Sequence, residues 1–291
     1  MEVGQLLSQG LTFGAVFAVV ALAYHLIYVT TGLLNFALGD QMAVAGLVAL
    51  TLESVGLPMP LAIVGAVAAG TLLGAVYERL AMTPAKKMGP AGPILATIGV
   101  ALVLTHGRVL LWGPNPRAFP AFTGGENATV GFLGGRWLIQ SFWIIGIALV
   151  ATAVLVWWLQ RTAWGRRWRA TAQNPLGARL CGVNPQVVST GAVAVAGGLV
   201  SLMGIAIAPI ALAGGFFGLE FGVKGFAAAI IGGFDSTSGV LLGGLIVGLL
   251  DSFLAGTISA SAADAALYGI LIVALLIRPY GLLGTPAVDR A

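Results

Sequence analysis

The chain has 291 residues, of which 58% are hydrophobic and only 8% are charged, and its formal net charge is +4. Soluble domains carry roughly 25% charged residues, so this composition excludes a soluble globular protein of this length. The apolar residues come in blocks of about 20, the length at which a helix crosses a bilayer. The sequence therefore predicts an all-α, polytopic bundle of transmembrane helices, organised as one membrane domain over residues 1–291.

The expected spans follow the apolar blocks in chain order. No Lys or Arg precedes the first block, so it is expected to remain as a span rather than to be cleaved as a signal peptide. The continuous blocks lie at roughly 10–30, 32–52, 58–79, 93–112, 137–159, 186–208 and 264–279.

The region 220–256 differs from these blocks because a polar, glycine-rich stretch, from Gly232 and Gly233 through Asp235 to Gly239, divides it. Backbone left unpaired in lipid is costly, so a break there has to be sheltered by protein or line a wet cavity, as in the broken helices of transporters. The alternative is an ordinary turn at the membrane surface. A re-entrant break gives about eight spans, and two crossings give about nine.

Basic residues indicate the orientation, because Lys and Arg of short loops gather on the cytoplasmic side. They lie in the loop at 79–93, in the segment at 160–185, and after the last span at Arg278 and Arg290. These regions and the C-terminus are predicted to be cytoplasmic. The loop at 113–136 is then outside. With nine spans the N-terminus is also outside, whereas with eight spans one end of the chain has to lie on the other side.

The segment at 160–185 concentrates five arginines and contains no acid. Trp164 and Trp168 share one face of a predicted helix. Asn174, followed by proline, is a signal for an N-cap, and Gly182 is a favoured residue after a helix end. We therefore expect one or two short helices on the cytoplasmic face. They serve either as an anchor whose tryptophans lie at the lipid interface or as a docking site for a partner.

Polar residues in or beside apolar blocks, together with the glycine pair of the break, are candidates for a translocation pathway, because ionisable groups in a membrane are costly. These candidates are Asn35, Asp40, Gly232, Gly233, Asp235 and Asp251. Instead of lining a pathway, Asp40 could cap a helix N-terminus, and Asp251 could bond a neighbouring helix. The stretches at 32–40 and 232–239 both read as polar entries to an apolar run, which suggests an internal repeat.

Other polar residues are expected to be structural. Asp264 is expected to cap the last span, Lys224 to snorkel to the interface, and Glu78 to be interfacial. His25 and His106 are expected to be hydrogen-bonded packing residues. Among the 43 glycines, many lie four apart, which allows helix backbones to approach closely. Such sets are Gly70/Gly74, Gly214/Gly218/Gly222, Gly239/Gly243 and Gly244/Gly248.

The sequence offers no set of residues for catalysis. The single cysteine, Cys181, excludes an intrachain disulfide, and no residues lie at zinc-ligand spacing. No Ser/His/Asp set and no phosphate-binding G-x-x-x-x-G-K-[ST] motif is present. We therefore expect neither an enzyme nor a cofactor in this chain.

From Gly165 onward, GRRWRATAQNPLGARLCGVN resembles the cytoplasmic loop of branched-chain amino acid ABC transporter permeases. Six other stretches also resemble motifs of this family. They are GLLNFALGD at 32–40, ERLAMTPAKK, ATIGVALVL, GPNPRAFP in the 113–136 loop, the glycine-rich region, and RPYGLLG at 278–284. The likeness covers nearly the whole chain, in the right order. One departure is Thr83, where the family usually has Arg, and the stretch 234–239 is polar for the family.

The resemblance implies a permease subunit of an ATP-driven importer in the bacterial inner membrane. Its partners would be two cytoplasmic ATP-binding subunits that use the ATP, a second related permease chain, an extracytoplasmic solute-binding protein and lipid, but no nucleic acid. The solute would be a branched-chain or other small amino acid, or an amide such as urea. The residues implied to couple to the ATPase are Gly165, Arg166, Arg169, Ala170, Asn174, Ala178, Arg179 and Gly182.

The alternative is a secondary transporter driven by an ion gradient. Such a transporter favours paired intramembrane charges, and the acids of this chain have no obvious partner in the sequence.

Overall fold

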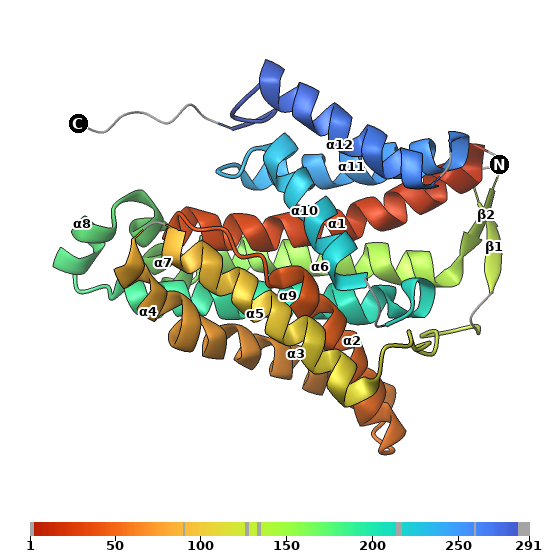
Figure 1. The fold of residues 1–291 in the computed structure, drawn as a ribbon, viewed down its shortest axis with the longest axis horizontal. Helices are drawn as coiled ribbons and strands as arrows, with labels where there is room; N and C mark the ends of the chain where they lie inside the picture. Colours follow the sequence, from red (N-terminus) through yellow and green to blue (C-terminus); the bar gives the residue numbers. More distant parts are fainter. Residues whose placement is uncertain are drawn as a thin grey trace.

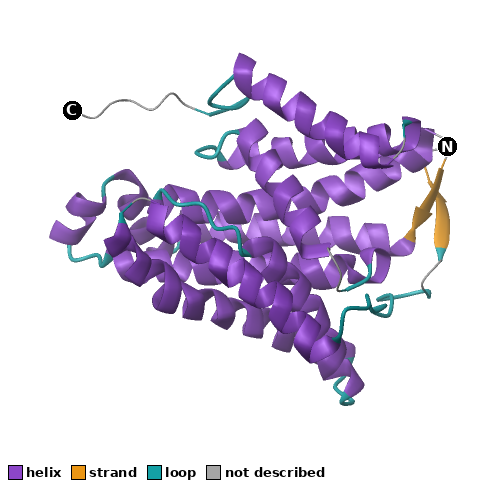
Figure 2. Cartoon of the chain, viewed as in Figure 1, coloured by secondary structure: helices purple, strands orange, loops and turns teal. Residues whose placement is uncertain are grey.

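The computed structural model describes residues 3–89, 91–125, 128–132, 135–213, 217–258 and 260–284. Over these residues the chain is a bundle of helices with one small β-hairpin (Figures 1 and 2), so the predicted all-α class is confirmed. The elements are α1 (Val3–Thr31), α2 (Leu38–Ser54), α3 (Met59–Tyr77), a π-helical turn (Glu78–Met82), α4 (Thr83–Ala85), a 3-10 turn (Lys86–Met88), α5 (Ala91–Trp112), β1 (Thr129–Phe132), β2 (Gly135–Leu138), α6 (Ile139–Arg161), α7 (Ala163–Gln173), α8 (Pro175–Leu180), α9 (Pro185–Ala211), α10 (Phe217–Gly232), α11 (Thr237–Thr257) and α12 (Ala260–Ile277).

Within the described residues, six helices are long and apolar enough to cross a membrane, by length and composition. They are Val3–Thr31, Met59–Met88, Ala91–Trp112, Ile139–Arg161, Pro185–Ala211 and Thr237–Thr257. α2 and α10 are shorter, with 17 and 16 residues. The block predicted at 32–52 begins late, because Gly32 (φ 67°) ends α1 and residues 33–37 are not helical. The number of bilayer crossings stays a prediction.

α1 lies at the centre of the bundle and is almost entirely buried, whereas α5 is mostly exposed. α11, α9, α10 and α6 all pack against α1. Its closest partner is α11, and glycines make that contact possible. A Cβ on Gly244 would overlap the backbone of Ala18, and a Cβ on Gly248 would overlap the backbone of Gly14. Lipid gives no hydrophobic drive for helix association, so such close packing stabilises the pair.

The other four-residue glycine sets also lie at helix contacts, as predicted, except that Gly214 is outside the described residues. Gly70 and Gly74 of α3 lie against Ser201 and Val193 of α9. Gly243 lies against Ala228 of α10.

The polar break in 220–256 is a tight turn that joins the antiparallel helices α10 and α11. Gly233 adopts a φ of 100°, and the Ser236 hydroxyl accepts a hydrogen bond from the Gly239 N–H (3.1 Å) to begin α11. The C-terminal segment closes on this turn, since the Leu282 N–H donates to the Ile231 carbonyl (2.7 Å). Residues 232–239 therefore form a closed turn, and whether α10 and α11 re-enter the membrane or cross it stays a prediction.

The interruptions inside the bundle lie instead before α2 and before α10. Both helices begin within the bundle rather than at one of its ends (Figure 1). Their first turns touch, because a Cβ on Gly39 would overlap the carbonyl oxygen of Gly218 and lie 2.9 Å from the Cα of Gly222. The predicted internal repeat of the stretches 32–40 and 232–239 stays a prediction.

The predicted basic regions gather at one end of the bundle. α4, α7, α8 and the C-terminal end of α12 lie at this end, and β1 and β2 lie at the opposite end beside the start of α1 (Figure 1). Arg290 is outside the described residues. In the loop at 113–136, β1 pairs antiparallel with β2, and Arg117 forms a bridge with Ala213 after α9. Glu126, Asn127, Leu133 and Gly134 of this loop are also outside the described residues.

The contact between α1 and α11 gives a first prediction. Gly248→Leu should lower the stability of the bundle by roughly 3 kcal/mol, because the new side chain has to displace the α1 backbone. Thermal unfolding of the purified protein in detergent, followed by tryptophan fluorescence, measures this. Gly146→Leu on α6 is the control, since a Cβ there meets no atom within 4 Å. Equal melting of the two variants would contradict the packing.

Candidate translocation pathway and coupling surface

The basic segment forms two short helices, α7 and α8, where its capping signals predicted them. The Thr162 hydroxyl accepts a hydrogen bond from the Gly165 N–H (3.1 Å) at the start of α7. The Asn174 carboxamide oxygen accepts one from the Gly177 N–H (2.9 Å) at the start of α8. Gly182 follows α8 with a φ of 79°, the left-handed conformation expected of glycine after a helix end.

The tryptophans of α7 face the protein. Trp168 is 7% exposed, and its indole Nε1 donates to the Leu26 carbonyl of α1 (3.4 Å). Trp164 stacks on Trp158 of α6 with ring centroids 4.4 Å apart. A membrane anchor needs these rings at the lipid interface. The observed contacts therefore remove the main support for the anchor interpretation.

The residues predicted to couple to an ATPase divide into an inner and an outer set. Gly165 and Ala178 are buried, and a side chain on Gly165 would overlap the Leu159 carbonyl. Ala170 and Arg169 are half-buried, and the Arg169 guanidinium donates to the Leu159 carbonyl at the C-terminal end of α6. A cation is favourable there because of the helix dipole. The exposed members are Arg166, Asn174, Arg179 and Gly182.

Two exposed leucines of α8 belong to the same surface and were missed by sequence reasoning. Leu176 is 69% exposed and Leu180 is 83% exposed. We call the surface formed by Arg166, Arg167, Leu176, Arg179 and Leu180 the basic face. It combines two exposed leucines with three exposed arginines, a mixture that suits a protein-binding surface.

His25 and Leu26 of α1 connect α7 to the turn between α10 and α11, and we call this pair the α1 junction. The two ring nitrogens of His25 contact the Phe234 carbonyl oxygen (Nδ1, 2.7 Å) and the Thr237 hydroxyl (Nε2, 3.0 Å). The Leu26 carbonyl accepts from Trp168. The prediction that His25 is a hydrogen-bonded packing residue is confirmed. His106 also forms the expected hydrogen bond, since its Nδ1 lies 2.8 Å from the carbonyl oxygen of Leu102 within α5, but the residue is exposed, so the prediction that it is a packing residue is wrong.

Asp40 has two partners on α5 and caps no helix. It lies in the first turn of α2, and no side chain caps that helix by a hydrogen bond. The Thr105 hydroxyl donates to Asp40 Oδ1 (2.5 Å), and Arg108 Nη2 lies 3.7 Å from the same oxygen. Asp40 and Arg108 are each 4% exposed. The sequence analysis found no partner for the acids in apolar segments, and for Asp40 this expectation is wrong. Arg108 lies inside the predicted block 93–112, so a search for every charge within a span would have found it.

Asn35 shapes the entry to α2. Its side-chain oxygen accepts from the Ala37 N–H (3.0 Å), and its Nδ2 donates to the Tyr77 hydroxyl (2.7 Å). The Tyr77 hydroxyl donates in turn to Gln41 (3.0 Å). This fully buried network holds the non-helical residues 33–37 against α3, because buried polar groups need partners.

A cavity of about 320 Å³ lies beside Asp40, between α1, α2, α5 and α10. Asp40 and Arg108 contribute to its wall, together with Thr105, Gly39 and Gly218. Of the predicted pathway residues, only Asp40 lies here. Gly232 and Gly233 are buried in the α10–α11 turn, and Asp235 is exposed on that turn. The pathway candidates thus do not form one site.

Asp251 belongs to a separate charged cluster around Lys224. Lys224 Nζ lies 2.9 Å from Glu220 Oε1, 3.0 Å from Asp251 Oδ1 and 3.2 Å from Asp264 Oδ1. Lys224 is 4% exposed, so it does not snorkel to the interface, and Asp264 pairs with it instead of capping α12. Of the two alternatives for Asp251, the bond to a neighbouring helix is the one observed, because Asp251 of α11 pairs with Lys224 of α10. These ion pairs join α10, α11 and α12.

Glu78 is fully buried, and the expectation that it is interfacial is wrong. Its carboxylate accepts hydrogen bonds from Thr83 (3.0 Å), Ser189 (3.1 Å) and Thr190 (2.6 Å), and also from Gln186 (2.9 Å). The cluster joins the end of α3 to the start of α9. Thr83, the departure from the family pattern, therefore has a structural role here.

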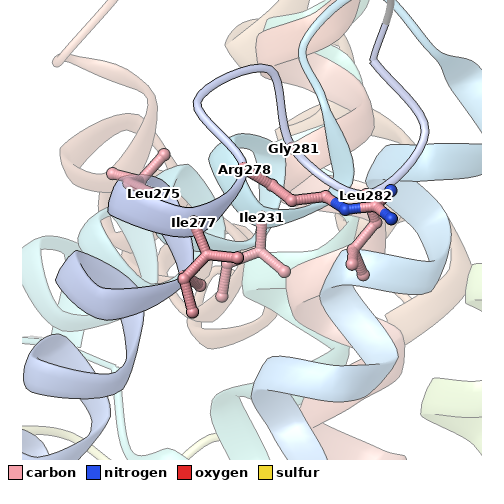
Figure 3. Close-up of a pocket in the computed structure, with 7 residues that line it drawn as sticks. Ile231, Leu275, Ile277, Arg278, Gly281 and Leu282 are labelled. Atoms are coloured by element: carbon pink, nitrogen blue, oxygen red, sulfur yellow. The ribbon is translucent and has the colours of Figure 1, made fainter.

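The C-terminal segment encloses a second, smaller cavity of about 230 Å³ against α10. Figure 3 shows Ile231 facing Ile277 and Leu282, with the Arg278 side chain lying along Leu282. Gly281, with a φ of 79°, allows the return of the chain. The RPYGLLG stretch therefore forms a closure over the end of α10, lined mainly by apolar side chains.

The Lys224 cluster gives a second prediction. Lys224→Met should destabilise the protein by about 3 to 5 kcal/mol, because it leaves Asp251 buried without its cation. Adding Asp251→Asn should restore most of the loss. Thermal unfolding in detergent measures both, with Lys87→Met at an exposed position as control. A single variant as stable as this control would show that the ion pairs carry no stability.

Comparison with known proteins identifies the family. The model for the branched-chain amino acid transport system permease component matches residues 6–277. The chain is 29% identical to the high-affinity branched-chain amino acid transport system permease protein BraD of Pseudomonas aeruginosa, over 98% of this chain and 97% of that protein. It is 27% identical to the corresponding protein LivH of Escherichia coli, with the same coverage.

More distant similarities are also present. The ribose import permease protein RbsC of Escherichia coli is 29% identical over 81% of this chain and 73% of that protein. The solved structure of PsaBC from Streptococcus pneumoniae in complex with Fab has a TM-score of 0.51 and 15% identity, and covers 94% of this chain and 92% of that chain. At this identity the structural likeness concerns the fold alone.

The family match spans nearly the whole helical bundle, from α1 to the end of α12. The chain belongs to the family of permease components of branched-chain amino acid transport systems, and it is a multi-pass membrane protein and not an enzyme.

Proposed function

We propose that this chain is the permease subunit of an ATP-driven importer in the bacterial inner membrane. It passes a branched-chain or related small amino acid, or a related amide, that an extracytoplasmic binding protein delivers. Family membership supports transport, and the basic face supports the ATP-driven mechanism. A partner supplies the ATPase, because the sequence has no phosphate-binding motif of its own.

The single observation that carries this proposal is the two-sided build of α7 and α8. The inner side is fixed to α1 and α6 through Trp168, Trp164 and Arg169. The outer side exposes Leu176 and Leu180 among arginines that have no acid nearby in the sequence. A lipid anchor has its aromatic rings outside, whereas a docking helix has a fixed inner side and an accessible outer side.

The orientation follows from the same end of the bundle. α4, α7, α8 and the C-terminal end of α12 carry the basic residues, and this end is cytoplasmic by the positive-inside rule. The N-terminus and the β-hairpin then face outward, where a binding protein docks. Two ATP-binding subunits and a second, related permease chain complete the importer, and the exposed apolar side of α5 meets lipid or that second chain.

The transport step is a population shift between two packings, without covalent chemistry. Motion of the ATPase moves the basic face, and Trp168 transmits it to the α1 junction. His25 passes it to the turn between α10 and α11. The start of α10, which lies against the start of α2, then moves within the bundle.

An ion-gradient-driven transporter is the second candidate. Paired intramembrane charges favour it, and two such pairs are present, Asp40 with Arg108 and Lys224 with Asp251. The charge argument against this candidate therefore no longer applies. The family relation now favours the importer in its place, since the chain matches permease components over residues 6–277.

The test is recovery of the ATPase subunit with the tagged chain from native membranes in mild detergent. Arg166→Glu with Arg179→Glu should reduce the recovery roughly tenfold or more, because charge reversal sets like charges against the partner. Arg136→Glu, exposed at the opposite end of the bundle on β2, is the matched control and should not change it. Arg169 is left intact because it holds α6 to α7.

Two results would contradict the importer. One is a wild-type chain that brings down no ATPase subunit, which would favour the gradient-driven transporter. The other is full recovery with both arginines reversed, which would mean that the basic face is not the docking surface.

A further inference from the structure

A small polar cavity of about 90 Å³ lies at the outer end of the bundle, and it offers more room than one buried water needs. We call this end outer because it lies opposite the basic face, with β1, β2 and the start of α1 (Figure 1). The polar residues that line the cavity are Gln5, Ser8, Gln9 and Thr12 of α1, Arg136 of β2 and Ser141 of α6. None of the described residues that line it is acidic.

The four polar residues of α1 share one face of a helix that is otherwise mainly apolar, because positions three and four apart on a helix are neighbours. The Thr12 hydroxyl is satisfied within α1, since it donates to the Ser8 carbonyl (2.7 Å). Gln5 and Gln9 are exposed, whereas Ser8 is buried between them. This face therefore presents one hydroxyl group and two carboxamides to the cavity.

Two buried serines give the cavity hydroxyl groups that have no protein partner. Ser8 is 4% exposed and Ser141 is 3% exposed. Neither side chain forms a hydrogen bond with another described residue, and both hydroxyl oxygens keep accessible surface in the cavity that the two residues line. Buried hydroxyl groups normally have a partner, so these two point to a polar ligand in the cavity.

The charges around the two hydroxyl groups favour an anion. α1 begins at Val3 and α6 at Ile139, so the first turn of each helix lies at the cavity with the positive end of its dipole. A Cβ on Gly135 would overlap the backbone of Gly4, so β2 lies directly on the start of α1 and holds Arg136 there. None of the ion pairs found among the described residues includes Arg136. Helix N-termini and a free cation, without an acid, suit an anion.

We propose that this cavity binds one small monovalent anion, such as chloride or formate. The anion accepts hydrogen bonds from the Ser8 and Ser141 hydroxyl groups and is neutralised by Arg136 and by the first turns of α1 and α6. Gln5 and Gln9 close the exposed side. The bound anion joins α1, β2 and α6, and it stabilises the outer end of the bundle. The site is separate from the basic face and does not depend on the ATP-driven mechanism.

The test is the melting temperature of the purified full chain in detergent, with sodium chloride in place of sodium gluconate at constant ionic strength. Chloride should raise the melting temperature by about 2 to 4 °C, because a ligand that binds only the folded chain stabilises it. Formate should give a similar rise, whereas gluconate is too large for the cavity. The rise should saturate with the concentration of the anion, unlike a general effect of salt on protein stability.

Variants assign the effect to the cavity. Arg136→Gln should remove most of the rise, whereas Arg136→Lys, which keeps the charge, should retain part of it. Ser8→Ala with Ser141→Ala should raise the chloride concentration for half of the effect about tenfold or more, because hydrogen bonds to a charged ligand are lost. Arg161→Gln, exposed at the other end of α6, is the matched control and should keep the full rise. The melting temperature of each variant in gluconate reports its folding separately from its response to the anion.

Four outcomes overturn the site. The first two are equal melting in chloride and gluconate, and a rise that grows with chloride without saturating. The third is a full rise that persists in Arg136→Gln and in the double serine variant. The fourth concerns Glu2, which is outside the described residues. If chloride raises the melting temperature only in Glu2→Gln, a carboxylate of the chain itself fills the site and the proposal is wrong.

Discussion

The close contact of α1 with α11 is the constraint on which the rest of the structure depends. Water does not drive helices together inside a membrane, so their association relies on shape and on short backbone distances. Gly14 and Ala18 of α1 meet Gly248 and Gly244 of α11, where even one methyl group would overlap backbone. This contact allows α1 to be surrounded by α6, α9, α10 and α11 and to serve as the fixed axis of the bundle.

A fixed axis gives the remaining elements a common reference. The end of α1 contacts Trp168 of α7 and the turn after α10 through two adjacent residues, His25 and Leu26. α10 then leads back into the bundle, where its first turn meets the first turn of α2 beside Asp40 and Arg108. In the proposed importer, the basic face and the cavity beside Asp40 are therefore two ends of one connected set of contacts.

The sequence predicted those features that neighbouring residues determine. The all-α class, most helix ranges, and the caps at Asn174 and Gly182 follow from local composition and from side chains that bond backbone a few residues away. It failed where partners are distant along the chain. Lys224 was assigned to the interface because its partners Asp251 and Asp264 lie on other helices, and Asp40 was left unpartnered because Arg108 lies on α5. Local composition also could not tell that residues 232–239 form a turn at the bundle end, since a polar glycine-rich stretch suits both places.

In the proposed importer, the α1 junction transmits motion from the basic face to α10 and α11. The most direct measurement is solute uptake per ATP hydrolysed in proteoliposomes that contain the complete transporter with His25→Leu. His106→Leu is the control, because His106 bonds only a carbonyl within its own helix among the contacts described. His25→Leu should keep ATP hydrolysis but lose most uptake, whereas His106→Leu should keep both. A His25→Leu transporter with an unchanged ratio of uptake to hydrolysis would contradict this role of the α1 junction.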